Sequence, residues 1–480
     1  MTSKAISKFV RGARYRYASL SSELRDALVY GLSAMFALLT ILVSSIPLYR
    51  QWGEIAIGAY IAGTVWCIGV AFRHKISGAN NKDSFEDHTL ESFAGDMQYG
   101  RDSQQQGAWK RGWSRPRMIV MGIVMCGSTL LPLALESYWQ YNPVAYSTTT
   151  RHAQPEVLVV DKAGQNILKG RDPYTVTNAK QVSNHQQVPA GQPSYDAFFP
   201  YLPAMAVFGM GSGTKLPGPL GNARVMFLLV TAAAVLLAIY INGVVDDNSI
   251  LGLQAMLVLP SAALPLSTGG DDIPVIALML LGLVLMRKHK LLAAGVVLGM
   301  AASLKFTSWP LVMLALLVTY VVFSLKDTLK MIAGAGIIII PSVVPVAMEN
   351  VRAFVVNVIL YPLGLAGIRS PAASPMPGHI LTSTMPSIHS TYSLVIILAG
   401  GVVFLAALRR WFPRSSSSLA SFVGWAFIVA VMLAPATRFG YLVYPFDLII
   451  WSKMLQLEST NISSGNELPS AASRRLPATV

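Results

Sequence analysis

The sequence contains few charged residues and almost no cysteine. Only 12% of its 480 residues are Asp, Glu, Lys or Arg, and 53% are hydrophobic, whereas a soluble domain carries about 25% charged residues. This shortage of charge, together with long apolar runs, excludes a soluble protein and makes lipid the solvent for most of the surface. The two cysteines, Cys67 and Cys126, both lie inside apolar runs, which argues against a disulfide framework or a zinc site.

The charges that are present are mainly basic, with 37 Lys and Arg against 23 Asp and Glu and a net charge of +14. Nucleic-acid-binding proteins gather such an excess on one surface, often with aromatic residues. Here the basic residues stand between apolar runs, as in membrane proteins that keep Lys and Arg in cytoplasmic loops. We therefore expect no nucleic-acid partner.

Twelve apolar segments are candidates for transmembrane helices, although several are short for a crossing of about 20 residues. They are residues 27–48, 54–72, 117–137, 198–212, 223–244, 272–287, 289–304, 307–324, 331–349, 393–411, 419–435 and 440–453. The basic loops between them, including Lys215 with Arg224 and the cluster at 287–290, are expected in the cytoplasm. This count predicts an all-α polytopic protein of a bacterial inner membrane, with about 12 transmembrane helices and both termini inside.

A further apolar segment, residues 249–266, does not fit this even number of crossings. It contains Pro260 and Pro265 and is followed by a Gly-Gly-Asp-Asp sequence. Counted as a crossing, it would place the basic cluster at 287–290 outside. Proline is tolerated where the backbone is re-entrant, so we expect the segment to dip into the membrane and return. Asp271 and Asp272 would then lie on the outer face.

The chain is expected to have five parts. They are a basic N-terminus (1–26), two accessory transmembrane helices (27–72), a cytoplasmic loop (73–116), a membrane core (117–453) and a disordered C-terminal tail (454–480). The outer loops of the core, 138–197 and 350–392, are long, and loops of that length are usually functional.

The first outer loop carries the most informative sequence. Between Val157 and Leu168 the apolar positions fit a short amphipathic helix, and Gly170 provides its C-cap. Such a helix would lie on the outer membrane surface and place Glu156 or Asp161 at the level of the lipid headgroups. The residues Phe-Phe-Pro-Tyr-Leu-Pro at 198–203 then open the next predicted span.

These features resemble glycosyltransferase family 87, membrane mannosyltransferases of the GT-C class that use polyprenyl-phosphate-mannose. Gly170, Asp172 and Tyr174 match the Gly-x-Asp-x-Tyr turn of the family, and the aromatic and proline residues at 199–203, with Tyr201 at the centre, match its entry into the next span.

Two further stretches look like the same family, and the resemblance extends over about residues 117–453. One contains Gly-Gly-Asp-Asp at 269–272, followed by Lys305 and Trp-Pro at 309–310. The other contains Tyr-Pro-Leu-Gly at 361–364 and ends in Pro-Gly-His at 377–379. Residues 1–116 look like an addition to this GT-C-like core.

The resemblance implies an enzyme that transfers a sugar from a polyprenyl-phosphate donor to a glycolipid or glycan acceptor on the extracytoplasmic side, with inversion. By the same resemblance, the sugar is expected to be mannose. A carboxylate would take the proton of the acceptor hydroxyl. The family's acid falls at Glu156, where the family usually has Asp, and Asp161 is the alternative. Cations would hold the leaving phosphate; the candidates are Lys305, Arg352, Arg369 and Arg438. The remaining candidates for substrate contact are Asp172, Tyr174, Tyr201, Asp271, Asp272 and His379. No cofactor is expected and a metal is not indicated.

Other interpretations of these residues remain open. Glu156 and Asp161 could be solvated loop acids, and Asp271 with Asp272 could cap the following helix. The outer Lys and Arg side chains could reach lipid phosphates instead of substrate, and Asp172 could serve only to hold its turn. The rival class of protein is a transporter or lipid flippase, and a scaffold protein is a third. Carriers usually place ionisable residues near mid-bilayer and show repeated halves, and neither feature is evident here.

Overall fold

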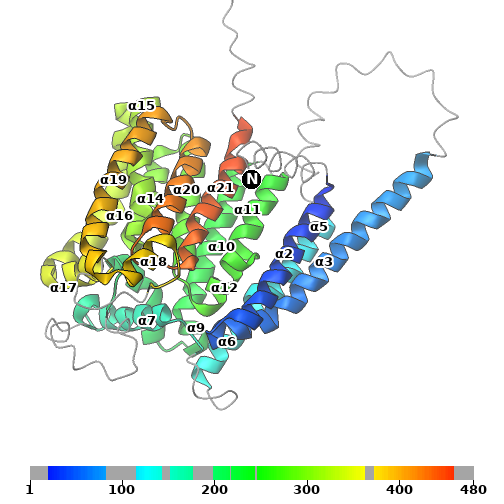
Figure 1. Cartoon of the computed structure of the whole chain (residues 1–480), viewed down its shortest axis with the longest axis horizontal. Coiled ribbons are helices and arrows are strands. Elements are labelled where there is room, and N and C mark those ends of the chain that lie inside the picture. The colour runs from blue at the N-terminus through cyan, green and yellow to red at the C-terminus, as the bar shows by residue number, and fades with distance from the viewer. Residues whose placement is uncertain are drawn as a thin grey trace, which may run out of the picture.

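In the computed structural model the chain forms a bundle of helices, most of which run roughly parallel or antiparallel to one another (Figure 1). The structure describes residues 20–82, 115–142, 152–176, 198–216, 218–243, 246–362 and 372–458. Within these ranges the β pairing is limited to one bridge between Ala373 and Thr437. The all-α prediction is therefore confirmed for the described part of the chain.

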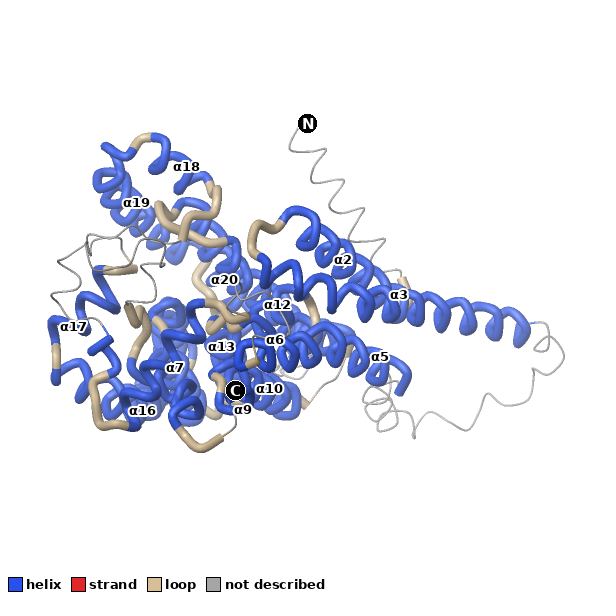
Figure 2. The backbone as a smooth tube through the Cα atoms, turned by 90° about the horizontal axis from the view of Figure 1, so that it is seen from below, coloured by secondary structure: helices blue, strands red, loops and turns tan. Residues whose placement is uncertain are grey.

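The N-terminal helices form an antiparallel hairpin that packs beside a third long helical segment (Figures 1 and 2). These elements are α2 (Ser22–Val43), α3 (Pro47–Lys82), and the continuous run of α5 (Arg115–Met125), η1 (Cys126–Leu130) and α6 (Leu131–Tyr141). The hairpin exposes many large apolar side chains, such as Leu42, Val65 and Trp66. Such a surface is suited to lipid rather than water.

The amphipathic helix predicted in the first outer loop is present as α7 (Pro155–Leu168). It lies across one end of the bundle, at the bottom of Figure 1. Gly170 follows it with φ +64°, and its N–H donates to the carbonyl of Ile167, as expected for a glycine that ends a helix. We call this end of the bundle the α7 end.

The segment 198–212, predicted to cross the membrane, does not form a transmembrane α-helix. It continues from an extended stretch into a 3₁₀ helix, η5 (Pro203–Gly213), which packs against α7. The contact is backbone to backbone, because a Cβ on Gly209 would lie 2.0 Å from the carbonyl oxygen of Val160. Most apolar residues of this segment are buried in protein instead of facing lipid, although Val207 is exposed. Composition does not distinguish these two environments.

The segment 249–266 was predicted to dip into the membrane and return, and this prediction was wrong. Its residues belong to α11 (Asp247–Leu257) and α12 (Pro260–Thr268), which continue one another and together are long and apolar enough to cross a membrane. Pro260 occupies the first turn of α12, where proline needs no intrahelical hydrogen bond. The proline therefore interrupts the path of the chain without reversing it.

The two ends of this segment confirm that it runs the length of the bundle. Asp247 accepts hydrogen bonds from Arg25 and Arg117, at the end where α2 begins. Thr268 accepts a hydrogen bond from the backbone N–H of Gln154, next to α7. We call the first of these the Arg25 end of the bundle.

Arg224 was expected among the cytoplasmic charges but lies at the α7 end. It opens α10 (Ala223–Asn242), and its buried guanidinium donates to the carbonyls of His152 and Ser267. Its side chain holds neighbouring elements together, which charge counting along the sequence cannot reveal. Replacing 198–212 by 247–268 as a crossing leaves the predicted number of crossings unchanged.

The remaining helices complete the bundle. They are α13 (Asp272–Arg287), α14 (Leu291–Leu304), α15 (Trp309–Val322), α16 (Leu325–Glu349), α19 (His389–Arg410), α20 (Ser416–Leu433) and α21 (Val443–Met454). Within the described residues, 8 helical segments are long and apolar enough to cross a membrane. The polytopic architecture is thus supported, and the count of 12 crossings stays a prediction.

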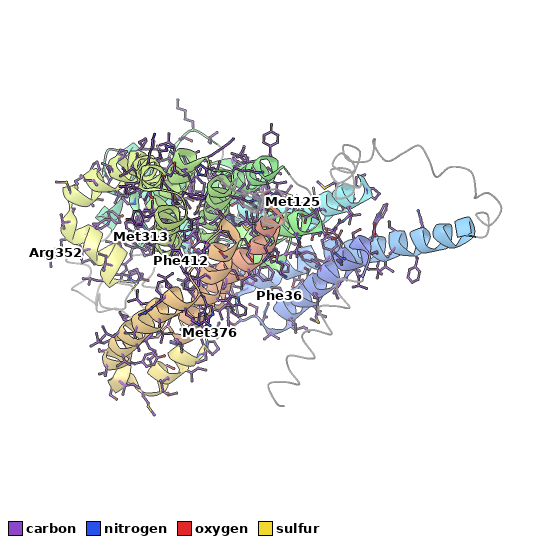
Figure 3. All side chains as sticks on the ribbon, turned by 90° about the horizontal axis from the view of Figure 1, so that it is seen from above. Phe36, Met125, Met313, Arg352, Met376 and Phe412 are labelled. Carbon is purple, nitrogen blue, oxygen red and sulfur yellow. The ribbon has the colours of Figure 1, made fainter. Side chains whose placement is uncertain are left out.

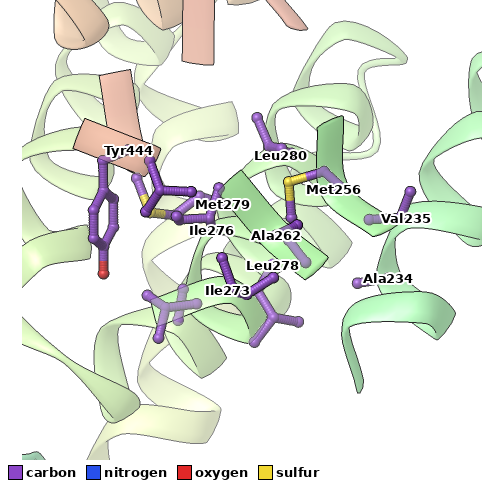
Figure 4. Packing of buried hydrophobic residues seen from close by; sticks show 14 of the residues in the cluster. Ala234, Val235, Met256, Ala262, Ile273, Ile276, Leu278, Met279, Leu280 and Tyr444 are labelled. Atoms are coloured by element: carbon purple, nitrogen blue, oxygen red, sulfur yellow. The ribbon is translucent and has the colours of Figure 1, made fainter. Parts of the chain in front are cut away.

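Helix α13 forms the centre of the core. All of its residues from Ile273 to Met286 are buried, and Figure 4 shows Ile276 and Met279 close to Tyr444 of α21, with Met256 of α11 nearby. By contrast, none of the residues of α19 is buried. The elements that meet at the α7 end are therefore anchored on a well-packed interior.

Candidate active site

Glu156 stands in the first turn of α7 and is 6% exposed. Its Oε1 accepts a hydrogen bond from Nη1 of Arg438, at 2.5 Å. Arg438 directly precedes the short helix η9 (Phe439–Leu442), which leads into α21. The fold thus pairs an acid and a cation that are far apart in the sequence.

A second group of charges is centred on Lys305, which lies between α14 and the short helix η6 (Phe306–Ser308). Its Nζ donates to Oδ1 of Asp271 at 2.7 Å and to Oδ1 of Asp272 at 2.6 Å. The hydroxyl of Tyr444 donates to the same oxygen of Asp272 at 2.7 Å. Nζ also lies 5.1 Å from the ring centroid of Tyr201, within the range of a cation–π contact.

The two groups influence one another electrostatically. Burial raises the pKa of Asp271, the positive charge of Lys305 lowers it, and the negative charges of Asp272 and Glu156 raise it further. Burial lowers the pKa of Lys305, but the two aspartates outweigh it and raise that pKa above its ordinary value. Lys305 is therefore a cation that is held between two carboxylates.

A turn of unusual backbone geometry brings the two groups together. Gly269 has φ +106°, and a Cβ at this position would lie 1.9 Å from Cγ2 of Val157. The turn that carries Asp271 therefore lies directly against the first turn of α7. Gln154 fastens the contact, because its backbone N–H donates to the Thr268 carbonyl at 2.9 Å and its Nε2 to the Thr268 hydroxyl at 2.7 Å.

Asp161 has a different environment from Glu156, although both lie on α7. Its Oδ1 accepts the backbone N–H of Ala223 at 3.1 Å, at the start of α10, where a carboxylate satisfies an otherwise unpaired helix donor. Burial raises the pKa of Asp161 to about 7. This carboxyl group is part of the junction between two helices.

The Gly-x-Asp-x-Tyr turn holds the chain in place after α7. Oδ1 of Asp172 accepts the backbone N–H of Tyr174 at 2.8 Å, which is the bond of an Asx-turn. Tyr174 is fully buried, and its hydroxyl donates to the Tyr201 carbonyl at 2.8 Å. Of the two interpretations of Asp172, this geometry favours the turn. A substrate contact by Asp172 or Tyr174 stays a prediction.

The remaining candidates do not join the two groups of charges. Arg352, on α17 (Val351–Val355), is exposed at the edge of the molecule (Figure 3). His379, on α18 (Pro377–Thr384), places Nδ1 2.9 Å from the Pro435 carbonyl, beyond the end of α20. Arg369 lies outside the described residues. A substrate contact by any of these three stays a prediction.

Two tyrosines at this site were not predicted from the sequence. Tyr444 bonds to Asp272, and Tyr441 lies close enough to Asp272, Lys305 and Arg438 for their charges to act on its hydroxyl. The signal was present in the spacing, since 438, 441 and 444 recur every three residues and share one side of a helical run. Across the described residues, no three His, Cys, Asp or Glu side chains form a group that could hold a metal ion.

Comparison with known proteins gives a match in the central and C-terminal part of the chain. Residues 200–435 match the model of glycosyltransferase family 87, while no curated protein and no solved structure matches. The matched region includes Tyr201, Lys305 and the aspartates at 271–272, whereas Glu156 and Arg438 lie outside it. The resemblance drawn from the sequence is thereby confirmed over this region.

Proposed function

Since residues 200–435 belong to glycosyltransferase family 87 and the chain is therefore a glycosyltransferase, we propose that it uses a polyprenyl-phosphate-sugar, with mannose as the sugar. The acceptor would be a hydroxyl of a glycolipid or glycan on the outer face of a bacterial inner membrane. The observation that carries this proposal is the pairing of Glu156 with Arg438 beside the group formed by Lys305 and its two aspartates.

Glu156 is the proposed general base. In one displacement, the acceptor oxygen forms a bond to the anomeric carbon while the bond from that carbon to the phosphate oxygen breaks. The acceptor proton passes to the carboxylate of Glu156, and the polyprenyl phosphate leaves with the bonding electrons. A single displacement inverts the anomeric centre, and a positioned carboxylate is a suitable base for the hydroxyl proton.

Arg438 is the proposed contact for the phosphate. In the ion pair, its side chain is 33% exposed, whereas that of Glu156 is 7% exposed. The guanidinium is thus the partner that an incoming anion meets, and its fork of N–H donors suits a phosphate. The side chain of Lys305 is 12% exposed and held by two carboxylates, so its proposed role is to fix the aspartates and add positive potential behind the site.

The proposal places the α7 end outside the membrane. Basic residues at the opposite end support this orientation. Arg25 and Arg117 bond to Asp247 there, and Arg287 donates to Asn242 and to the Met454 carbonyl. Lysine and arginine accumulate on the cytoplasmic side of membrane proteins.

The experiment that tests this function also separates an enzyme from a carrier. The purified protein is reconstituted in liposomes with radiolabelled polyprenyl-phosphate-mannose and a bacterial membrane extract as the source of acceptors. We expect the donor to be consumed and the label to appear in a new glycolipid or glycan. Movement of intact donor across the bilayer without turnover would contradict the proposal and favour a flippase.

A further inference from the structure

The N-terminal hairpin lies outside the region matched to the family, yet it bonds to Gln154, two positions before the proposed base. Tyr49 stands in the first turn of α3, and its hydroxyl accepts a hydrogen bond from Nε2 of Gln154 at 3.1 Å. The charges of Glu156 and Arg438 both act on this hydroxyl. The hairpin therefore contributes a polar side chain to the immediate surroundings of the Glu156–Arg438 pair.

The half of the hairpin near the α7 end is fastened to the rest of the bundle. Nε1 of Trp52, which is fully buried, donates to the Ser128 carbonyl at 2.9 Å. About two turns further along α3, the hydroxyl of Tyr60 donates to the Val258 carbonyl at 2.6 Å. These two bonds attach α3 to η1 and to the junction of α11 and α12, so the position of Tyr49 is well defined.

The other half of the hairpin is held by a buried ion pair at the Arg25 end. Nε of Arg117 donates to Oδ2 of Asp26 at 2.6 Å, and its Nη1 donates to Asp247 at 2.6 Å. Gln254 adds hydrogen bonds to Asp26 and to the hydroxyl of Tyr30, both at 3.1 Å. The hairpin is thus fixed at both ends against helices of the core, beside α12, α5 and α6 (Figure 2).

We propose that Tyr49 is a positioning residue for the proposed base, and that the N-terminal hairpin is therefore a working part of the catalytic unit. Tyr49 holds the side chain of Gln154, which also bonds to Thr268. Gln154 is the residue before α7 and stands two positions before Glu156. Its orientation sets how the first turn of α7 meets the turn that carries Asp271. This inference rests on the proposed function.

The test is the variant Tyr49→Phe, assayed for turnover of radiolabelled polyprenyl-phosphate-mannose in liposomes with the membrane extract. Loss of one neutral hydrogen bond that supports the base is expected to lower kcat about threefold to tenfold. The KM for the donor and the melting temperature are expected to stay unchanged. Gln154→Leu breaks the same link from the other side and is expected to lose at least as much.

Two controls distinguish positioning from a general effect on folding. Tyr60→Phe removes a buried hydroxyl from the same helix, away from Gln154, and is expected to lower the melting temperature while kcat at 25 °C stays unchanged. In the second control, Tyr49→Phe is added to Gln154→Leu. Because Tyr49 acts through Gln154, the second substitution is expected to cause no further loss of kcat.

The assays distinguish a failure of the proposed function from a failure of the role proposed for Tyr49. Absence of donor turnover by the wild-type protein overturns the proposed function and this inference with it. Turnover by the wild type together with an unchanged kcat in Tyr49→Phe overturns this inference alone. The same holds if Tyr49→Phe lowers kcat by an equal factor with and without Gln154.

Discussion

Glu156 and Asp161 stand five positions apart on one helix, are equally buried at 6% exposure, and face different partners. Glu156 meets the guanidinium of Arg438, and Asp161 meets a backbone N–H at the start of α10. The first contact is a hydrogen bond between two charged groups, and the second is a hydrogen bond to a neutral backbone donor. The two acids therefore differ in the partner that each one binds, and we expect them to differ in role.

The raised pKa of Asp161 predicts a pH dependence of stability. In the folded protein burial raises this pKa from 3.8 to about 7. Between these values the folded chain binds more protons than the unfolded chain, so this group makes stability fall as the pH rises through that window. Asp161→Asn keeps an acceptor for the Ala223 N–H and removes the titration.

The measurement is the melting temperature in detergent between about pH 4.5 and pH 7.5, the window in which the group titrates. We expect the wild-type melting temperature to decline more steeply with pH than that of Asp161→Asn. Equal slopes for the two proteins would show that Asp161 does not titrate in this range.

The residues that carry the proposed site were only partly evident from the sequence. Glu156, Lys305 and the aspartates at 271–272 were predicted from a resemblance, and Arg438 from its expected place at the outer face. The structure brings these residues together. The family spacing favoured Glu156 and left Asp161 as the alternative, because both acids lie at or within the same predicted helix. Their difference depends on a contact with Ala223, distant in sequence, and no local pattern encodes such a contact.

Among the elements, the contact between α7 and the turn at 269–272 joins the two groups of charges. Gly269 permits this contact through its positive φ and through the absence of a side chain facing Val157. The helix α7 itself was predictable, since its apolar period, its length and its glycine cap agree. The path of the neighbouring segments was not, because apolar residues buried in protein and apolar residues facing lipid have the same composition.

Gly269→Ala is expected to separate α7 from this turn. The new Cβ would lie 1.9 Å from Val157, which backbone movement has to relieve, in addition to about 1 kcal/mol or more for a non-glycine residue at positive φ. We expect a lower melting temperature and loss of most sugar transfer.

The matched control for this substitution is Gly243→Ala at the end of α10. Gly243 also has a positive φ, of 75°, but the nearest atom to a Cβ there is 3.9 Å away. We expect this variant to lose only the stability that a strained backbone costs, and to keep its activity. Similar losses in both variants would mean that strain, and not the approach to Val157, governs the effect of Gly269→Ala.

At the scale of the whole molecule, two groups of charged residues with different roles lie at opposite ends of the bundle. The α7 end holds the group proposed for catalysis, and the Arg25 end holds the ion pairs that bind the hairpin to the core. The polytopic class followed from the low charge and the long apolar runs of the sequence. The number of crossings did not, because helices such as α14 (Leu291–Leu304) and α21 (Val443–Met454) are short and depend on their neighbours for burial.

The orientation of the bundle is testable by cysteine labelling in a background of Cys67→Ser and Cys126→Ser. Phe439 is 54% exposed next to Arg438, and Lys290 is exposed in the turn between α13 and α14. We expect a membrane-impermeant maleimide added to intact cells to label Phe439→Cys and not Lys290→Cys. The opposite pattern would place the proposed site in the cytoplasm.

The most direct test of Glu156 as the base compares the rates of sugar transfer by Glu156→Gln and Asp161→Asn. Each rate is measured at the same amount of folded protein in the membrane. Loss of a general base lowers the rate about 10²-fold to 10⁴-fold, and we expect this loss for Glu156→Gln alone. Asp161→Asn, which keeps the bond to α10, is expected to stay close to the wild-type rate. Transfer by Glu156→Gln at a rate similar to that of the wild type would contradict the assignment of the base.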